Sequence, residues 1–230
     1  MVARPHVAIV IDRMTVDDLA AVQEIERESF TTPWPPHAYS SELENNRMAH
    51  YIVAREGERV VGFAGMWLMV DEAHITTFAV RKTWRRQGVG ERLLLALLAL
   101  AEARGAREAT LEVRPSNHPA RRLYEKYGFA LVGLRPRYYS DDNEDALIMT
   151  TDQLDGRPMR ERLARLRAEV AKRPDIELGD DGSPIERPQA GGGAAGGDGA
   201  EGEGTEGEGA EGGHAIAPDV LRLSSVRKSS

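Results

Sequence analysis

One segment constrains the fold more than any other, because a strand pattern, a glycine-containing loop and a long apolar helix follow one another within residues 73–105. Ala73–Val80 is rich in β-forming residues, Gly88 and Gly90 open the helix, and Gly105 ends it. The helix carries one wide apolar stripe made of Leu93, Leu94, Leu97, Leu98 and Ala101. A stripe of that width has to lie on a sheet, so the segment predicts an α/β fold.

Strand and helix patterns on both sides of this segment extend the prediction. Helices are expected after Thr15, around residues 37–43 and over Pro119–Tyr127, and Phe30–Pro36 is expected to be a proline-rich loop. Further strands are expected over Val7–Ile11, Tyr51–Ala54, Val60–Val70, Ala109–Val113, Phe129–Leu134 and Ala146–Thr150. The expected architecture is a mixed α/β (α+β) sandwich.

The composition changes sharply toward the end of the chain, which indicates three regions. Residues 1–155 hold the patterned elements, and 156–174 form an amphipathic but highly charged helix that we expect to dock only weakly. Residues 175–230 carry 12 Asp/Glu against 4 Lys/Arg, and 12 of the 23 glycines lie within 190–213. Such a tail cannot bury enough apolar surface to fold, so we expect disorder. Residues 216–223 are either a frayed terminus or a short partner-binding motif.

Charge and cysteine content exclude several classes of function. The first 174 residues are nearly neutral, which disfavours an obligate nucleic-acid binder. The chain has no cysteine, so disulfides, thiolate metal sites and cysteine nucleophiles are excluded, and we expect no metal site. Apolar runs are too short for a signal peptide or a membrane span, so we expect a soluble, cytoplasmic protein without membrane contact.

The loop before the long helix has the properties of a pyrophosphate site. In Arg85-Arg86-Gln87-Gly88-Val89-Gly90, glycine lets the backbone approach an anion, and the first N–H groups of the helix point outward. Glycine turns also open many helices that bind nothing. A phosphate-binding Walker loop would need Gly-Lys-Ser/Thr, and a dinucleotide fingerprint would need a third glycine and an acidic ribose ligand. Neither the Walker sequence nor the dinucleotide fingerprint is present here.

This loop resembles the Arg/Gln-x-x-Gly-x-Gly/Ala motif of the GNAT superfamily of acetyltransferases. The later runs 111–118, 120–129, 137–140 and 144–149 are similar to those of the RimI-type ribosomal-protein alanine N-acetyltransferases. The resemblance covers about residues 8–152 and implies a mostly antiparallel central sheet flanked by helices. It also implies acetyl-CoA as co-substrate and a protein N-terminus, from a ribosomal protein, as acceptor.

The resemblance implies roles for particular residues. Pantetheine would pair with the backbone of Phe78, Ala79 and Val80. The pyrophosphate would be held by Arg85, Arg86, Gln87, Gly88, Val89 and Gly90. Asn117 would bind the cofactor near its thioester. Glu112 matches the family's base and Tyr124 its acid. The pattern alone favours other readings, in which Glu112 lines a solvated face with Thr110 and Arg114 and Tyr124 packs in the core.

Aromatic residues in two separate loops are candidates for the acceptor groove. Trp34 lies in the proline-rich loop, and Tyr138 and Tyr139 lie before an acidic cluster over residues 141–145. That cluster would attract a basic second residue of the acceptor or would serve only solubility. His74 stands where an apolar or small residue is expected, and it faces substrate or is an ordinary buried histidine.

Three functions remain open from the sequence. The first is acetylation of an N-terminal alanine, which fits the chemistry because an α-amine costs about 1.4 kcal/mol to deprotonate at pH 7, against about 4.6 for lysine. The second is acetylation of lysine or a small-molecule amine. The third is a non-catalytic acetyl-CoA-binding regulator.

Overall fold

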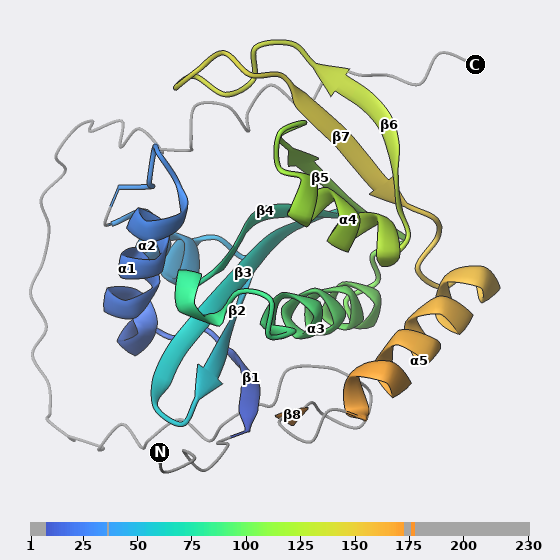
Figure 1. Ribbon diagram of the computed structural model, residues 1–230, viewed down its shortest axis with the longest axis horizontal. Coiled ribbons are helices and arrows are strands. Elements are labelled where there is room, and N and C mark those ends of the chain that lie inside the picture. Colours follow the sequence, from blue (N-terminus) through green and yellow to red (C-terminus); the bar gives the residue numbers. More distant parts are fainter. Residues whose placement is uncertain (1–7, 36, 173–175, 178–230) are drawn as a thin grey trace, which may run out of the picture. The chain divides into compact units, whose positions relative to one another are not determined.

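A computed structural model describes residues 8–35, 37–172 and 176–177 of the chain. Its strands form one sheet in the order β6-β7-β5-β4-β3-β2-β1-β8 (Figure 1). The strands are β1 Ile9–Arg13, β2 Ala49–Glu56, β3 Arg59–Met69, β4 Glu72–Val80, β5 Glu108–Val113, β6 Phe129–Arg135, β7 Ala146–Thr151 and β8 Ile176–Glu177. Pairs β4–β5 and β1–β8 are parallel and the others antiparallel, which confirms the mixed, mostly antiparallel sheet.

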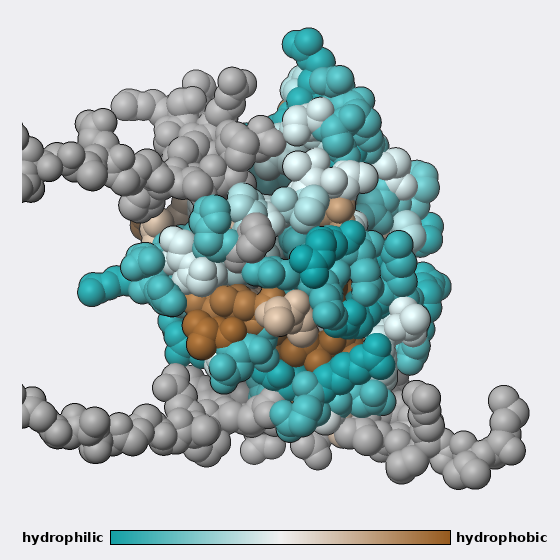
Figure 2. Space-filling model, turned by 90° about the vertical axis from the view of Figure 1, so that its left-hand side faces the viewer, coloured by the Kyte–Doolittle hydropathy of each residue, from teal (hydrophilic) through white to brown (hydrophobic). Residues whose placement is uncertain are grey.

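Helices cover both faces of this sheet, as the apolar stripes predict. They are η1 Val16–Asp18, α1 Leu19–Ser29, α2 Ala38–Asn45, η2 Lys82–Trp84, α3 Val89–Ala103, α4 His118–Lys126 and α5 Arg157–Ala171. One core joins α3, α4 and α5 to the sheet, and a second core joins α1 and α2 to the other face. Figure 2 views the side on which α1 and α2 lie and shows an apolar area bordered by hydrophilic surface.

The charged helix α5 is bound more firmly than its composition suggests. Its apolar positions Met159, Leu163, Leu166 and Val170 are each 2–3% exposed and belong to the same core as α3. The expectation of weak docking is therefore wrong, because the charges occupy the outer face while every fourth or third residue is apolar.

The disordered tail was expected to begin at residue 175. This start is wrong for Ile176–Glu177, whose backbone pairs in parallel with Ile9 and Val10 of β1. The rest of the expected tail, including residues 190–213 and 216–223, lies outside the described residues. None of the helices described is both long and apolar enough to cross a bilayer.

Strands β4 and β5 pair over only part of their length, and this shapes the site. Their register runs from Glu72 opposite Glu108 to Ile75 opposite Leu111 and goes no further. A register shift between β3 and β4 at this point inserts one extra residue, Thr76, into β4. The last residues of β4 thus keep β3 as partner while their other edge opens away from β5.

Candidate active site

A cavity of about 700 Å³ lies where β4 opens away from β5, a volume typical of small-molecule sites. It is bounded by the end of β4, the loop before α3, the first turn of α3 and the exposed side of α4. The residues lining it are Ser29, Phe30, Phe78, Ala79, Val80, Arg85, Arg86, Gly88, Gly90, Glu91, Asn117, Pro119, Ala120, Arg122, Leu123 and Lys126.

The backbone of the loop is bent in a way that suits an anion. Arg86 has φ 65° and Gly88 has φ 83°, so two nearby residues adopt the left-handed conformation, and only the second is glycine. A Cβ added at Gly90 would meet Leu123 at 3.5 Å and Phe78 at 3.6 Å, which are ordinary contacts. Packing therefore does not require glycine at position 90, whereas a ligand seated on the helix start would use the space.

Most of the residues that the sequence assigned to acetyl-CoA line this cavity. Phe78, Ala79, Val80, Arg85, Arg86, Gly88, Gly90 and Asn117 are among them. Two of the assigned residues turn elsewhere: the Gln87 side chain donates to the carbonyl of Thr83 at 2.7 Å, and Val89 is buried in the core. Asn117 also caps α4, because its Oδ1 accepts from the N–H of Ala120 at 3.3 Å.

Two basic residues of α4 that sequence reasoning did not single out also line the cavity. Arg122 and Lys126 lie four residues apart on one face of the helix. Lys126 contacts Glu91 of α3 at 2.7 Å, which ties the first turn of α3 to α4. The spacing Arg-x-x-x-Lys was visible in the sequence, but only the fold shows that it faces the loop with Arg85 and Arg86.

Glu112 is held between two basic side chains, one from the adjacent strand β4 and one from β6, which lies on the far side of β7. Its Oε2 lies 2.7 Å from Nε2 of His74 on β4, and its Oε1 lies 3.1 Å from Nε of Arg135 on β6. The side chain of Glu112 is only 8% exposed, and Thr110 on the same face is buried. The alternative that this face of β5 is simply solvated is therefore wrong.

Tyr124 packs into the core at the edge of the cavity. Its ring lies edge-on to Phe78, with centroids 6.2 Å apart, and tilted against Phe129 at 5.7 Å. Burial raises the pKa of the Tyr124 phenol well above its ordinary value of 10.0, so the group is protonated at neutral pH. The core packing that the pattern suggested is present, and Tyr124 is not itself among the residues that line the cavity but contacts Phe78, which is.

Tyr139 links the predicted catalytic residues to the β6–β7 loop. Burial raises its pKa, and the neighbouring Tyr138, Glu112 and Tyr124 add to this while Arg114 opposes it. The Arg114 guanidinium lies 3.8 Å from the centroid of the Tyr139 ring. Glu112 and Tyr124, which are far apart in the sequence, thus both lie close enough to Tyr139 to act on it.

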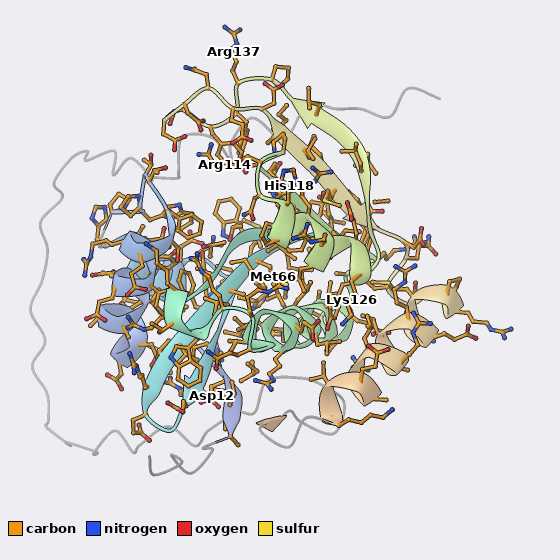
Figure 3. All side chains as sticks on the ribbon, in the orientation of Figure 1. Asp12, Met66, Arg114, His118, Lys126 and Arg137 are labelled. Carbon is orange, nitrogen blue, oxygen red and sulfur yellow. The ribbon has the colours of Figure 1, made fainter. Side chains whose placement is uncertain are left out.

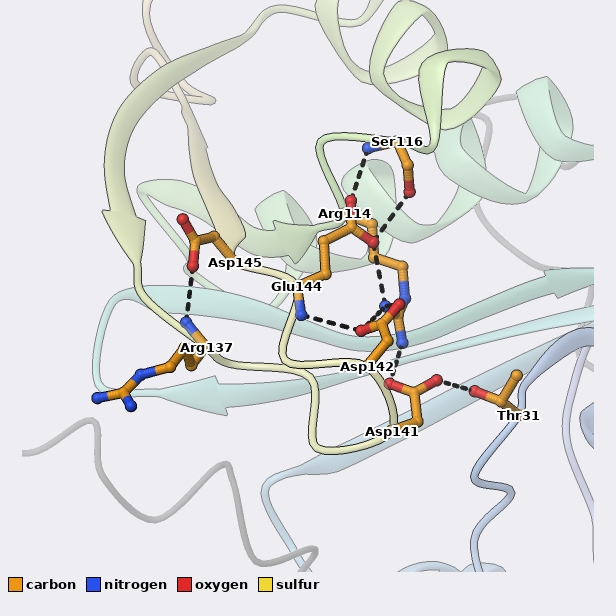
Figure 4. Close-up of polar contacts among 8 residues, drawn as sticks. All are labelled: Thr31, Arg114, Ser116, Arg137, Asp141, Asp142, Glu144 and Asp145. Carbon is orange, nitrogen blue, oxygen red and sulfur yellow. Dashed lines mark hydrogen bonds and ion pairs between the residues drawn. The ribbon is translucent and has the colours of Figure 1, made fainter.

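Arg114 organises the acidic cluster, as Figure 4 shows. It lies 2.6 Å from Asp141, 2.8 Å from Asp142 and 3.1 Å from Glu144. Three carboxylates on one guanidinium leave an excess of two negative charges in this loop. Hydrogen bonds to the backbone and hydroxyl of Ser116, followed by Arg114, lower the pKa of Glu144, so the loop stays charged at neutral pH.

The same cluster joins two loops on opposite sides of the site. The hydroxyl of Thr31, between α1 and α2, donates to Asp141 in the β6–β7 loop (Figure 4). This bond and Arg114 lower the pKa of Asp141 to about 2.

A second charged cluster lies at the other end of the sheet, where Arg55 bridges Asp12 and Asp18 and all three side chains are buried. Figure 3 labels Asp12 there and Arg114 at the top.

Trp34 stacks on Tyr39 of α2, with ring centroids 5.2 Å apart, and its backbone N–H donates to Glu26 at 3.2 Å. Burial raises the pKa of Glu26, although bonds from Tyr39 and Trp34 oppose the shift. Among the described residues, Trp34 contacts Tyr39 and Tyr138 contacts Tyr139, and the hydrogen bond from Thr31 to Asp141 connects the two loops that carry them. None of the three predicted acceptor residues is among those that line the cavity.

Residues 19–129 match the sequence model of the acetyltransferase (GNAT) family. A Bacillus subtilis (strain 168) protein, provisionally named a [ribosomal protein bS18]-alanine N-acetyltransferase, is 42% identical over 139 residues, covering 60% of this chain and 92% of the relative. The Escherichia coli (strain K12) enzyme of that name is 35% identical, covering 60% of this chain and 94% of its own. A crystal structure of the Escherichia coli ribosomal-protein-S18-alanine N-acetyltransferase superposes with TM-score 0.59 at 32% identity, covering 65% and 97% of the two chains.

Proposed function

Because this chain belongs to the GNAT family and is an acetyl-CoA-dependent N-acetyltransferase, we propose that it acetylates the N-terminal alanine of ribosomal protein bS18. The observation that carries the proposal is coverage: the chain spans 92–94% of relatives whose names give this acceptor, with 35–42% identity. A Mycobacterium tuberculosis relative named as an N-alpha-acetyltransferase, 37% identical, agrees with an α-amine as acceptor. Since ribosomal proteins are its acceptors in this proposal, it would act in the cytoplasm.

The cavity residues fit acetyl-CoA, which supplies an activated acetyl group as a thioester. Arg85, Arg86 and the N–H groups around Gly88 would hold its pyrophosphate, since cations and a helix start both favour an anion. The open edge of Phe78–Val80 offers backbone groups for the amide-bearing arm. Gly90, which has no side chain, lies between these two parts of the cavity lining.

Glu112 is our candidate for the group that takes the acceptor's proton. As the amine nitrogen bonds to the acetyl carbon, the carbon–sulfur bond breaks and the sulfur leaves with the electron pair. The amine proton passes to Glu112, directly or through one water. A carboxylate suits an α-amine near pKa 8, whose deprotonation at pH 7 costs about 1.4 kcal/mol.

Tyr124 is our candidate for the group that stabilises the departing thiolate. Ordinary pKa values already make proton transfer from tyrosine to a thiolate uphill by about 2 kcal/mol, and burial of Tyr124 adds to that cost. The phenol therefore donates a hydrogen bond rather than transferring its proton outright. Solvent then supplies the proton to sulfur and removes the one on Glu112.

The acceptor peptide is proposed to lie between Trp34 on one wall and Tyr138 and Tyr139 on the other. The excess negative charge around Arg114 favours an acceptor with a basic second residue.

Acetyl transfer to synthetic peptides beginning Ala-Arg tests the function, with the same peptides pre-acetylated as blanks. Free lysine, polyamines and aminoglycosides test the alternative of a different amine. Glu112→Gln is expected to lower kcat about 100-fold to 10,000-fold. Glu108→Gln on the same strand is the matched control and keeps full turnover.

Two outcomes would contradict the proposal. Turnover of lysine or a small amine in preference to the peptides would assign the alternative acceptor, and acetyl-CoA binding without transfer to any amine would indicate a regulator. Unchanged turnover by Glu112→Gln at neutral pH would remove Glu112 as the base.

A further inference from the structure

His74, Glu112 and Arg135 form a buried cluster contributed by three strands. Nε2 of His74 lies 2.7 Å from Oε2 of Glu112, and the histidine side chain is 2% exposed. Nε of Arg135 lies 3.1 Å from Oε1, close enough for an ion pair, but its N–H is not directed at an acceptor. Glu112 thus accepts one directed hydrogen bond, at Oε2, and feels a nearby positive charge at Oε1.

The hydrogen bond between His74 and Glu112 determines which ring nitrogen of His74 carries a hydrogen. An ionised carboxylate can only accept, so Nε2 of His74 must carry the hydrogen. Nδ1 is buried without a partner among the described residues, and an N–H there would lack an acceptor. The neutral tautomer with the hydrogen on Nε2 therefore costs least. It also blocks any proton path through the far side of the ring.

The two oxygens of Glu112 are consequently not equivalent. Oε2 is occupied by the His74 hydrogen bond, whereas Oε1 has a lone pair that Arg135 does not use in a directed bond. We propose that His74 is a positioning residue for acetyl transfer, which holds Oε2 so that Oε1 receives the acceptor's proton. This inference rests on the proposed function, because it needs Glu112 to be the base.

Two effects of losing the hydrogen bond oppose each other. Without the N–H of His74, the carboxylate becomes more basic, which by itself would aid proton removal. The carboxylate also becomes free to rotate, and a displacement of about 1 Å in a reacting group costs on the order of 100-fold in rate. Orientation therefore dominates, and the loss of His74 should slow the reaction.

Two amide substitutions at position 74 have the same polarity but different side-chain lengths, so they test whether a donor must reach Oε2 of Glu112. The amide nitrogen of His74→Gln lies about as far from the backbone as Nε2 of histidine, so it can still donate to Oε2. The amide of His74→Asn is one bond shorter and cannot. Steady-state kinetics with an Ala-Arg peptide over pH 4–9 are expected to show near-normal kcat for His74→Gln. For His74→Asn, kcat should fall about 10-fold to 100-fold with unchanged KM for acetyl-CoA.

The pH profile gives a readout that a merely structural role would not move. Below the pH range in which protonation of the acceptor amine limits the rate, His74→Asn should lose activity at a higher pH than wild type, because a carboxylate without its hydrogen bond holds a proton more tightly, and His74→Gln should follow wild type. The other charged or titratable groups around the cluster are Glu72, Glu108, Arg114, Tyr124 and Tyr139, and both variants keep all of them and Arg135. His50→Gln, far away beside Arg104, is the control.

The double variant tells the two proposals apart. If His74 acts through Glu112, His74→Asn should cause no further loss in a Glu112→Gln background. Equal kcat and pH profiles for His74→Asn and wild type, with Glu112→Gln inactive, would overturn only the inference. Equal losses in the Gln and Asn variants, or a further loss in the double variant, would overturn it as well. An active Glu112→Gln would remove Glu112 as the base and this inference with it, whereas wild type that fails to acetylate the Ala-Arg peptide would refute the proposed function.

Discussion

Helix α5 should contribute directly to the stability of the acetyltransferase domain, and Leu163→Ala tests this. Leu163 is 2% exposed within the core that α3 and α5 share. Truncating a buried leucine to alanine removes apolar burial and leaves a cavity, at a cost of about 2–5 kcal/mol. For a domain of this size, about 3 kcal/mol corresponds to a fall in Tm of roughly 6–12 °C.

Urea unfolding followed by circular dichroism measures the change, and Arg165→Ala, on the exposed face of the same helix, is the control. The control should alter the free energy of unfolding by about 0.5 kcal/mol or less. If Leu163→Ala unfolds at the same urea concentration as Arg165→Ala, the packing of α5 contributes nothing to the stability of the domain. A chain ending at residue 155 that is as stable as one ending at 172 would support the same conclusion. The boundary at 155 stays a prediction until then.

Three further changes probe the loops. Gly128→Ala should lower stability by about 1–3 kcal/mol in urea unfolding, because φ is +95° there and the new Cβ would meet Met159 Sδ at 2.9 Å; an unchanged midpoint would contradict this. Asp141 has a lowered pKa, so its contribution to stability is fully present above the ordinary pKa of 3.8 and is lost as the pH falls toward about 2. The protection of amides in the β6–β7 loop, relative to the intrinsic exchange rate at each pH, should accordingly fall below pH 4 in wild type, and in Arg114→Ala it should already be low at pH 7. Arg86→Ala should weaken acetyl-CoA binding about 10-fold in calorimetry, and unchanged affinity would exclude a pyrophosphate contact.

The elements and the cofactor loop could be predicted because their signals are local. Gly88, the apolar stripe of α3 and the strands around it depend on periodicity and backbone freedom, which neighbouring residues determine. The family resemblance added expected roles only where a motif matched, as at Glu112. For α5, the prediction of weak docking was wrong because it relied on the charge content of the helix. The helix packs through four apolar positions, Leu163 among them, that lie on one face between many charged residues.

Only the tertiary structure decided which side chains meet. The partners of Glu112 come from β4 and β6, and Thr31 meets Asp141 across 110 positions of the chain. The early end of β4–β5 pairing, which opens the cavity, also leaves no mark in either strand alone. Local sequence determines backbone conformation over a few residues. Contacts between distant segments depend on how whole faces pack, and that is a property of the folded chain.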